Sequence, residues 1–162
     1  MAAIAVGAEA PDFTLDGANL PPKQPFVLSS FRGKRDVALM FFPLAFTGVC
    51  SKEAGACETD YVAFADKDVL LAMISVDAKP SQAAFAEKLG IKSLPILADF
   101  HPKGEVGSKY GVYMADKGIH ARATVVVGKD GKVKWVKVNE LGVQRVNGEI
   151  LGAAQGARKA SA

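Results

Sequence analysis

The amino-acid sequence predicts an α/β protein in which a central mixed β-sheet is flanked by helices. Residues 37–42 and 69–76 are continuous apolar runs, which is typical of strands buried on both faces of a sheet. Between them, residues 50–65 carry apolar side chains at helical spacing. A strand, a helix and a second strand in this order predict a parallel pair joined by a right-handed crossover.

The later elements continue this alternation and include a hairpin. The sequence Gly128-Lys-Asp-Gly131 separates two β-rich runs, residues 123–127 and 133–138, and therefore predicts a tight turn. Residues 16–25 are rich in Pro, Gly and Asn and are expected to form turns. The other expected elements are a helix over residues 81–89, a strand near residues 95–97, a short helix before Gly111 and a closing helix over residues 147–158. This order is typical of a thioredoxin-like α/β sandwich.

Length and charge limit the class of protein further. The 162 residues predict a single domain, residues 1–162. The formal net charge is +3 without a basic run, so no nucleic-acid partner is expected. The longest apolar stretch, residues 37–46, is shorter than the roughly 20 residues that cross a membrane, so no membrane association is expected. The N-terminus lacks the basic start of a secretory signal, which favours a cytoplasmic protein.

Cys50 and Cys57 are the two cysteines of the chain. Two cysteines do not make a disulfide framework, and their spacing does not match a zinc site. The two histidines, His101 and His120, are expected to be isolated in loops, so they supply no further metal ligands. We therefore expect no metal, and the sequence shows no haem or flavin signature, so no cofactor is expected.

Cys50 lies in the first turn of the helix expected over residues 50–65. The free N–H groups and the dipole of a helix N-terminus favour an anion there, and a thiolate is such an anion. Position alone leaves two alternatives open, a reactive thiol and an inert buried cysteine. A Cys-x-x-Cys pair is absent because residue 53 is Glu, which disfavours a disulfide reductase.

The residues before Cys50 carry a longer pattern. Pro43, Thr47 and Cys50 follow the spacing P-x-x-x-T-x-x-C, which resembles the active-site signature of the peroxiredoxins. Further matches to that family, in chain order, are Ala10-Pro-Asp-Phe-Thr14, Glu53, Ile74-Ser-Val-Asp77, Gly118-Ile-His-Ala-Arg122, and Arg145 ahead of Glu149-Ile-Leu151. The resemblance spans residues 8–152.

The resemblance implies a thiol-dependent peroxidase that reduces hydrogen peroxide and organic hydroperoxides. The Cys50 thiolate would attack one peroxide oxygen and become a sulfenic acid. Arg122 would supply charged N–H donors, and the Thr47 hydroxyl would bridge thiolate and peroxide. Pro43, which has no N–H, would cover the pocket and exclude water.

Two further residues have supporting roles in this interpretation. Glu53 would orient an arginine, and Arg145 matches the second arginine of the family. Taken singly, the catalytic residues have simpler interpretations: Thr47 as a helix N-cap, Arg122 as a solvated charge at a strand end and Pro43 as a strand terminator. The complete pattern favours the functional assignment for all three.

Cys57 has two interpretations. As a resolving cysteine it would form a disulfide with Cys50, but residues seven apart on a helix are separated by about 10.5 Å along its axis. A disulfide needs Cα atoms about 4.4–6.8 Å apart, so the helix would have to unwind, and Gly55 weakens it. As a core residue, Cys57 belongs to the apolar stripe with Tyr61 and Phe64.

The preferred hypothesis is therefore a one-Cys enzyme that resembles the alkyl hydroperoxide reductase E-type or bacterioferritin-comigratory-type branch. Its partners would be a peroxide, an external thiol reductant of the thioredoxin, glutaredoxin or mycothiol kind, and a second copy in a homodimer. The alternatives are a two-Cys peroxidase with Cys57 as resolver, and a non-catalytic thioredoxin-like redox sensor or binding module.

Overall fold

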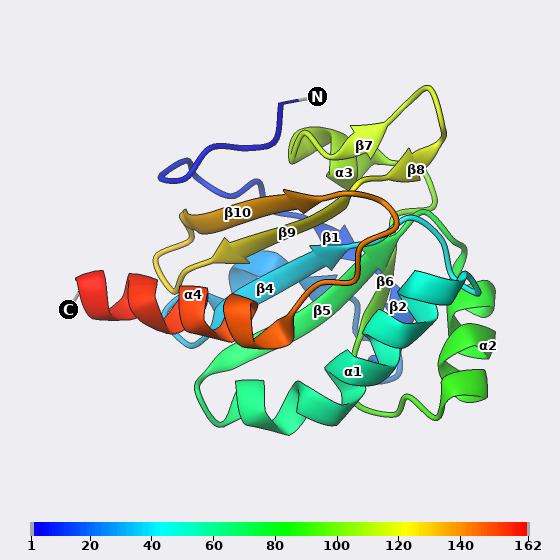
Figure 1. Cartoon of the computed structure of the whole chain (residues 1–162), viewed down its shortest axis with the longest axis horizontal. Coiled ribbons are helices and arrows are strands. Elements are labelled where there is room, and N and C mark those ends of the chain that lie inside the picture. The colour runs from blue at the N-terminus through cyan, green and yellow to red at the C-terminus, as the bar shows by residue number, and fades with distance from the viewer. Residues whose placement is uncertain (1, 162) are drawn as a thin grey trace.

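A six-stranded mixed sheet forms the centre of the molecule (Figure 1). The computed structural model describes residues 2–161, with side chains as far as residue 156. The sheet order is β10-β9-β4-β5-β6-β2, in which β4, β5 and β6 run parallel and the other neighbours are antiparallel. Its strands are β2 (Gly17–Ala18), β4 (Asp36–Phe41), β5 (Val69–Ser75), β6 (Ile96–Ala98), β9 (Arg122–Val127) and β10 (Val133–Asn139).

The central strands β4 and β5 are buried throughout, as their apolar composition predicts. Successive side chains of a strand point to opposite faces of the sheet. In β4, Ala38 and Met40 accordingly join the core on one face, whereas Val37, Leu39 and Phe41 join the core on the other. The predicted mixed sheet with helices packed against it is confirmed.

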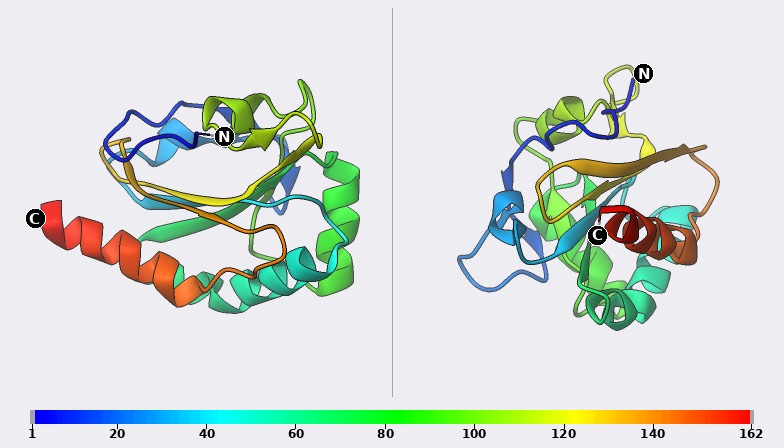
Figure 2. Two further views of the ribbon diagram at one scale, coloured as in Figure 1. Left: turned by 45° about the horizontal axis from the view of Figure 1, so that its top comes forward. Right: turned by 90° about the vertical axis from the view of Figure 1, so that its left-hand side faces the viewer.

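Each face of the sheet is covered by a different layer (Figure 2). Three helices, α1 (Gly48–Ala65), α2 (Lys79–Leu89) and α4 (Asn147–Ser161), lie on one face. The other face is covered by the N-terminal segment and by α3 (Glu105–Lys109). The smaller elements are β1 (Thr14–Leu15), which pairs with β3 (Phe26–Val27), the 3-10 helix η1 (Leu28–Phe31), and the hairpin of β7 (Tyr113–Met114) with β8 (Ile119–His120).

Strand register brings three chain segments to one edge of the sheet. Phe41, the last residue of β4, pairs with Ile74 of β5 and with Ala123 of β9. The loop that follows β4, the loop that follows β5 and the first residue of β9 therefore meet. The amino terminus of α1 begins at this same edge, directly after the β4 loop.

One expectation from the sequence was incomplete, and a second was wrong. Residues 16–25 are not all turn, because Gly17–Ala18 forms β2 and pairs with Leu97 and Ile96 of β6. A two-residue strand has no periodicity to detect. Gly17 tolerates the pairing because it lacks a Cβ, which would lie 2.1 Å from the Ile96 carbonyl oxygen.

His120 is also not isolated in a loop. It lies in β8, fully buried, with Nε2 2.9 Å from Oδ2 of Asp99. That carboxylate accepts hydrogen bonds from the backbone N–H groups of Val106 and Gly107 as well. The sequence did not indicate this pairing because Asp99 and His120 come from different elements, separated by α3 and β7.

Within residues 2–161, no helix is both long enough and apolar enough to cross a lipid bilayer. The longest described helix, α1, has 18 residues and carries charged side chains, among them Lys52 and Glu58.

Candidate active site

Cys50 is the third residue of α1 and is fully buried beneath the loop that joins β4 to the helix. The helix begins at Gly48 because Thr47 has extended backbone angles and its carbonyl accepts the first helical hydrogen bond, from the Ser51 N–H at 2.9 Å. Cys50 thus lies in the first helical turn, as predicted. The unpaired N–H groups of that turn favour negative charge on its sulfur.

Arg122 is the side chain that contacts the Cys50 sulfur. As the first residue of β9 it is buried on the helix-covered face, and its Nη2 donates to Sγ of Cys50 at 3.3 Å. Its Nη1 donates to Oε1 of Glu53, and its Nε donates to the Leu141 carbonyl at 2.8 Å. Three acceptors in three directions fix the plane of the guanidinium, so one N–H group always faces the sulfur.

Glu53 holds two arginines rather than one. Beyond Arg122, it accepts hydrogen bonds from Arg145 through Nε and the backbone N–H on Oε2 and through Nη2 on Oε1, at 2.8–2.9 Å. Burial alone would raise the pKa of Glu53, but the hydrogen bonds and charges of Arg145 and the charge of Arg122 outweigh burial and hold that pKa below its usual value. Glu53 is therefore an ionised, buried anchor for both guanidinium groups.

Arg145 lies in the segment between β10 and α4 and is buried. Its Nη1 donates to the Ala123 carbonyl at 2.9 Å and to Oγ1 of Thr124 at 3.1 Å. It makes no contact with Cys50. The structure therefore brings Arg145 to the candidate site through Glu53 and β9.

Thr47 and Pro43 belong to the loop above the sulfur. Thr47 occupies the N-cap position, yet its hydroxyl makes no cap hydrogen bond and instead donates to the Leu44 carbonyl at 2.7 Å. Pro43 is buried two residues after the end of β4. Between them, Phe46 has a positive φ of 65°, a backbone conformation uncommon for an aromatic residue, and its ring packs on Phe85.

The sequence did not reveal two further acceptors that hold the guanidinium groups in place. The Leu141 carbonyl fixes Nε of Arg122, and the Thr124 hydroxyl fixes Nη1 of Arg145. A backbone carbonyl has no side-chain signal in a sequence. Thr124 could have been found from its position in β9, two residues after Arg122 and therefore on the same face.

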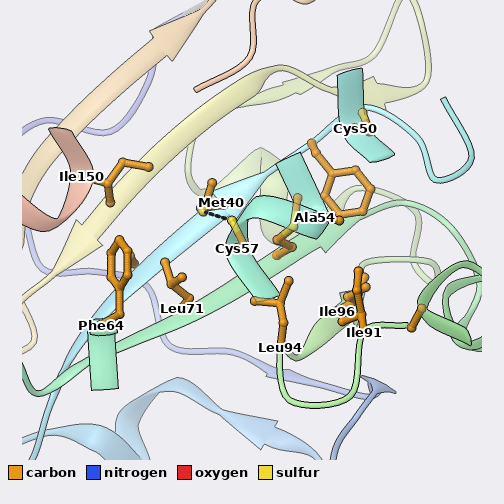
Figure 3. Close-up of a cluster of buried hydrophobic side chains, with 14 of the residues drawn as sticks. Met40, Cys50, Ala54, Cys57, Phe64, Leu71, Ile91, Leu94, Ile96 and Ile150 are labelled. Carbon is orange, nitrogen blue, oxygen red and sulfur yellow. Dashed lines mark hydrogen bonds between the residues drawn. The ribbon is translucent and has the colours of Figure 1, made fainter. Parts of the chain in front are cut away.

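Cys57 lies away from this cluster, two turns further along α1. It is fully buried, and its Sγ is 3.5 Å from Sδ of Met40 and 3.7 Å from Oδ1 of Asn147. Figure 3 shows Cys57 pointing to Met40 of β4, with Cys50 at the far end of the helix. Burial raises the pKa of the Cys57 thiol to about 12, so the reactive thiolate is scarce.

No group of three or more His, Cys, Asp or Glu side chains is arranged to hold a metal ion among the residues that the structure describes. The groups that the site offers are thus the Cys50 thiol, two fixed guanidinium groups, the Glu53 carboxylate and the hydroxyls of Thr47 and Thr124. This set can bind and polarise a small oxygen-containing molecule beside the sulfur.

Comparison with known proteins identifies the family. A family model described as "AhpC/TSA family" matches residues 6–136. The chain belongs to the AhpC/TSA family of peroxiredoxins. Among its relatives, alkyl hydroperoxide reductase E of Mycobacterium tuberculosis is 38% identical over 140 residues, which cover 86% of this chain and 89% of the relative. A chloroplastic 2-cysteine peroxiredoxin of Chattonella marina is 32% identical, over 94% of this chain and 80% of the relative.

Solved peroxiredoxin structures share the fold. The reduced 2-Cys peroxiredoxin of Plasmodium vivax superposes with a TM-score of 0.87 at 30% identity, covering 96% of this chain and 83% of that one. AhpC of Mycobacterium tuberculosis, at 22% identity and a TM-score of 0.84, supports the fold alone. The predicted thioredoxin-like fold and the resemblance to the alkyl hydroperoxide reductase E type are confirmed. This peroxiredoxin is a thiol-dependent peroxidase.

Proposed function

We propose that Cys50 is the peroxidatic cysteine and that the enzyme works through a one-Cys cycle with a sulfenic acid intermediate. The observation that carries the proposal is the Arg122 guanidinium, which donates to the Cys50 sulfur while Glu53 holds it in place. A fixed cation beside a buried thiol favours the thiolate. The same cation stabilises negative charge that develops on a nearby oxygen.

The first half-reaction transfers one oxygen atom. The thiolate sulfur of Cys50 attacks the terminal oxygen of hydrogen peroxide or of an organic hydroperoxide, so that an S–O bond forms as the O–O bond breaks. The electron pair of the broken bond leaves on the second oxygen, which takes up a proton and departs as water or an alcohol. Arg122 stabilises the sulfur before attack and the departing oxygen during it, and the buried Pro43 keeps bulk water out.

An external thiol completes the cycle. The Cys50 sulfenic acid condenses with the first thiol group, which releases water and leaves a mixed disulfide. A second thiol attacks that disulfide, restores Cys50 and leaves the reductant oxidised by two electrons. A reductant of the thioredoxin, glutaredoxin or mycothiol kind supplies these thiols.

Cys57 is a core residue in this proposal. Its thiol is buried between α1 and β4, its pKa is raised to about 12, and an intact α1 separates it from Cys50. The resolving role would require α1 to unwind from its first residue to beyond Cys57, which would break the Glu53 contacts with both arginines as well.

We further propose a cytoplasmic homodimer that pairs through the active-site edge. Phe46 and Phe100 are about half exposed at that edge, and Leu44 is exposed beside them, although large apolar side chains are usually buried. Sedimentation analysis should give a mass near twice that of the chain, and Phe46→Lys should shift it toward the monomer.

The deciding experiment is intact-mass analysis of the fully reduced protein after one equivalent of hydrogen peroxide, with a sulfenic-acid trap present. We expect one trap adduct on Cys50 and a free thiol at Cys57. Cys50→Ser should abolish peroxide consumption, and Cys57→Ala should leave it unchanged with a small-thiol reductant. A loss of two hydrogens with Cys50 joined to Cys57 would establish the two-Cys cycle instead. Peroxide consumption that survives in Cys50→Ser would overturn the assignment of Cys50.

A further inference from the structure

A chain of hydrogen bonds connects α2 to the loop that carries Thr47. It begins at the fully buried Gln82 of α2, whose Nε2 donates to the Leu97 carbonyl at 2.6 Å and to Oγ of Ser75 at 3.1 Å. Ser75 in turn donates its hydroxyl proton to Oδ2 of Asp77 at 2.7 Å. The same Oδ2 accepts the backbone N–H of Ala45 at 2.9 Å.

The directions of these bonds are fixed by what each group can donate. Ser75 Oγ accepts from Gln82 Nε2 and from the Asp77 backbone N–H at 3.3 Å. Its own proton is therefore committed to the Asp77 carboxylate. Oδ2 of Asp77 is the common acceptor of the Ser75 hydroxyl and the Ala45 N–H.

The Ala45 N–H and the Leu44 carbonyl belong to one rigid peptide unit. Asp77 holds the N–H end of that unit, and the Thr47 hydroxyl donates to its carbonyl end at 2.7 Å. Turning the peptide plane would therefore move the acceptor of the Thr47 proton. With its proton committed to Leu44, the Thr47 oxygen presents only lone pairs to a bound molecule.

We propose that Asp77 is a positioning residue for the peroxidase reaction, which acts through the Leu44–Ala45 peptide to fix the Thr47 hydroxyl as an acceptor for the peroxide O–H. Ser75 and Gln82 hold Asp77 in place. This inference rests on the proposed function, because it needs a peroxide bound between Thr47 and Cys50.

The test compares the second-order rate of Cys50 oxidation by hydrogen peroxide in four proteins: wild type, Asp77→Ala, Thr47→Val and the double variant. We expect Asp77→Ala to slow oxidation by roughly tenfold to a hundredfold, because small misplacements of catalytic groups have effects of that size. The double variant should be no slower than Thr47→Val alone, since Asp77 acts through Thr47. Alkylation of Cys50 by iodoacetamide, which needs no Thr47, should change by less than about twofold.

Asp77→Asn is the rescue variant, because an amide oxygen in the place of Oδ2 accepts both hydrogen bonds without the charge. It should recover most of the rate. The matched control is Asp66→Ala, an exposed carboxylate at the opposite end of α1, which should oxidise at the wild-type rate. If Asp77→Ala does not fold, Ser75→Ala is used in its place. Ser75→Ala should slow oxidation by less, and it should cause no further loss of rate when combined with Thr47→Val.

Wild-type protein that fails to oxidise at Cys50 would overturn the proposed function itself. Wild-type oxidation with an unchanged rate in Asp77→Ala would overturn only the role of Asp77. Losses that add in the double variant, or alkylation that slows in parallel with oxidation, would show that Asp77 supports the fold and not Thr47.

Discussion

Arg122 contacts the Cys50 sulfur and Glu53 through different nitrogens of one planar group. A lysine has a single charged nitrogen at the end of a flexible chain and cannot reproduce this fork. We expect Arg122→Lys to slow oxidation of Cys50 by peroxide by roughly a hundredfold. Stopped-flow competition kinetics would measure the effect.

The control for this variant is Arg35→Lys, a partly buried arginine directly before β4 and outside the candidate site, which should react at the wild-type rate. An Arg122→Lys protein that oxidised at the wild-type rate would mean that a positive charge is sufficient for fast oxidation of Cys50 and that the two-nitrogen geometry of arginine is not needed.

Glu53 is the other end of that contact, and its removal should affect stability as well as rate. Glu53→Gln leaves two buried guanidinium groups with no carboxylate, and breaking a buried ion pair costs about 3 kcal/mol or more. Urea unfolding at pH 7 would measure the loss. Glu87→Gln, on the exposed face of α2, should change the unfolding free energy by less than about 0.5 kcal/mol.

The difference between wild type and Glu53→Gln should depend on pH in a defined direction. Because the pKa of Glu53 is lower in the folded protein than in the unfolded chain, the unfolded chain binds the proton first as pH falls. The stabilisation is therefore complete above the ordinary value of 4.5 and disappears as pH falls through the lower folded value. An unfolding free-energy difference that grew on acidification would contradict this linkage.

Pro43, Thr47 and Cys50 could be grouped at the residue scale because their spacing is local. Pro43, Thr47 and Cys50 lie within eight consecutive residues. The pairing of Glu53 with Arg145 was harder, since 92 positions separate them and only the fold joins them. The Thr47 hydroxyl donates to the Leu44 carbonyl and does not accept from an N–H of its own helix. This choice could not be predicted, because both kinds of partner lie within three residues of Thr47.

At the scale of elements, α1 is tied to the strand that follows α2 by one side chain. Glu58 accepts the backbone N–H groups of Lys92, Ser93 and Leu94 at 2.8–3.2 Å, directly before β6. Burial would raise the pKa of Glu58, but these three hydrogen bonds hold it below its usual value.

Glu58→Ala should therefore lower the free energy of unfolding by about 1 kcal/mol near neutral pH, a value kept small because the carboxylate is partly exposed. The loss should shrink as pH falls through the lowered folded pKa, since the wild-type carboxylate then loses its charge. Urea titrations at pH 7 and pH 3 would measure both values. A loss of equal size at the two pH values would show that the contribution of Glu58 comes from packing.

Long periodic elements were predictable, and short ones were not. The strands β4, β5, β9 and β10 and the helices α1, α2 and α4 lie within a few residues of their predicted bounds. The two-residue strands β1, β2, β3, β7 and β8 were missed, because tertiary pairing creates them and no local pattern encodes them. The burial of His120 was missed for the same reason.

At the scale of the whole molecule, the reactivity of Cys57 measures how tightly α1 and α4 pack against the sheet. Cys57 is enclosed by β4 below it and by Asn147 at the start of α4. A reagent can reach it only when this packing opens, which in a stable core requires most of the free energy of unfolding.

In a Cys50→Ser background, alkylation of Cys57 by iodoacetamide at pH 8 should be at least roughly a thousandfold slower than in the urea-unfolded chain. The pKa of about 12 adds to this protection, because so little thiolate is present. Intact-mass time courses would follow the labelling. Labelling that is fast without denaturant would show that α4 detaches readily, and would revive Cys57 as a resolving thiol.

The pairing of two arginines with a single carboxylate leaves one positive charge to be matched by the sulfur. While Cys50 is a thiolate, the group of four is electrically neutral. In the proposed cycle the sulfur then becomes a neutral sulfenic acid, which leaves the group with an unmatched positive charge in a buried place. Under that proposal, oxidation makes the site attractive to anions, and the species proposed to react next, the thiolate of the reductant, is an anion. In the proposed cycle, the carboxylate that prepares the enzyme for peroxide thus leaves it, after the first half-reaction, prepared for its electron donor.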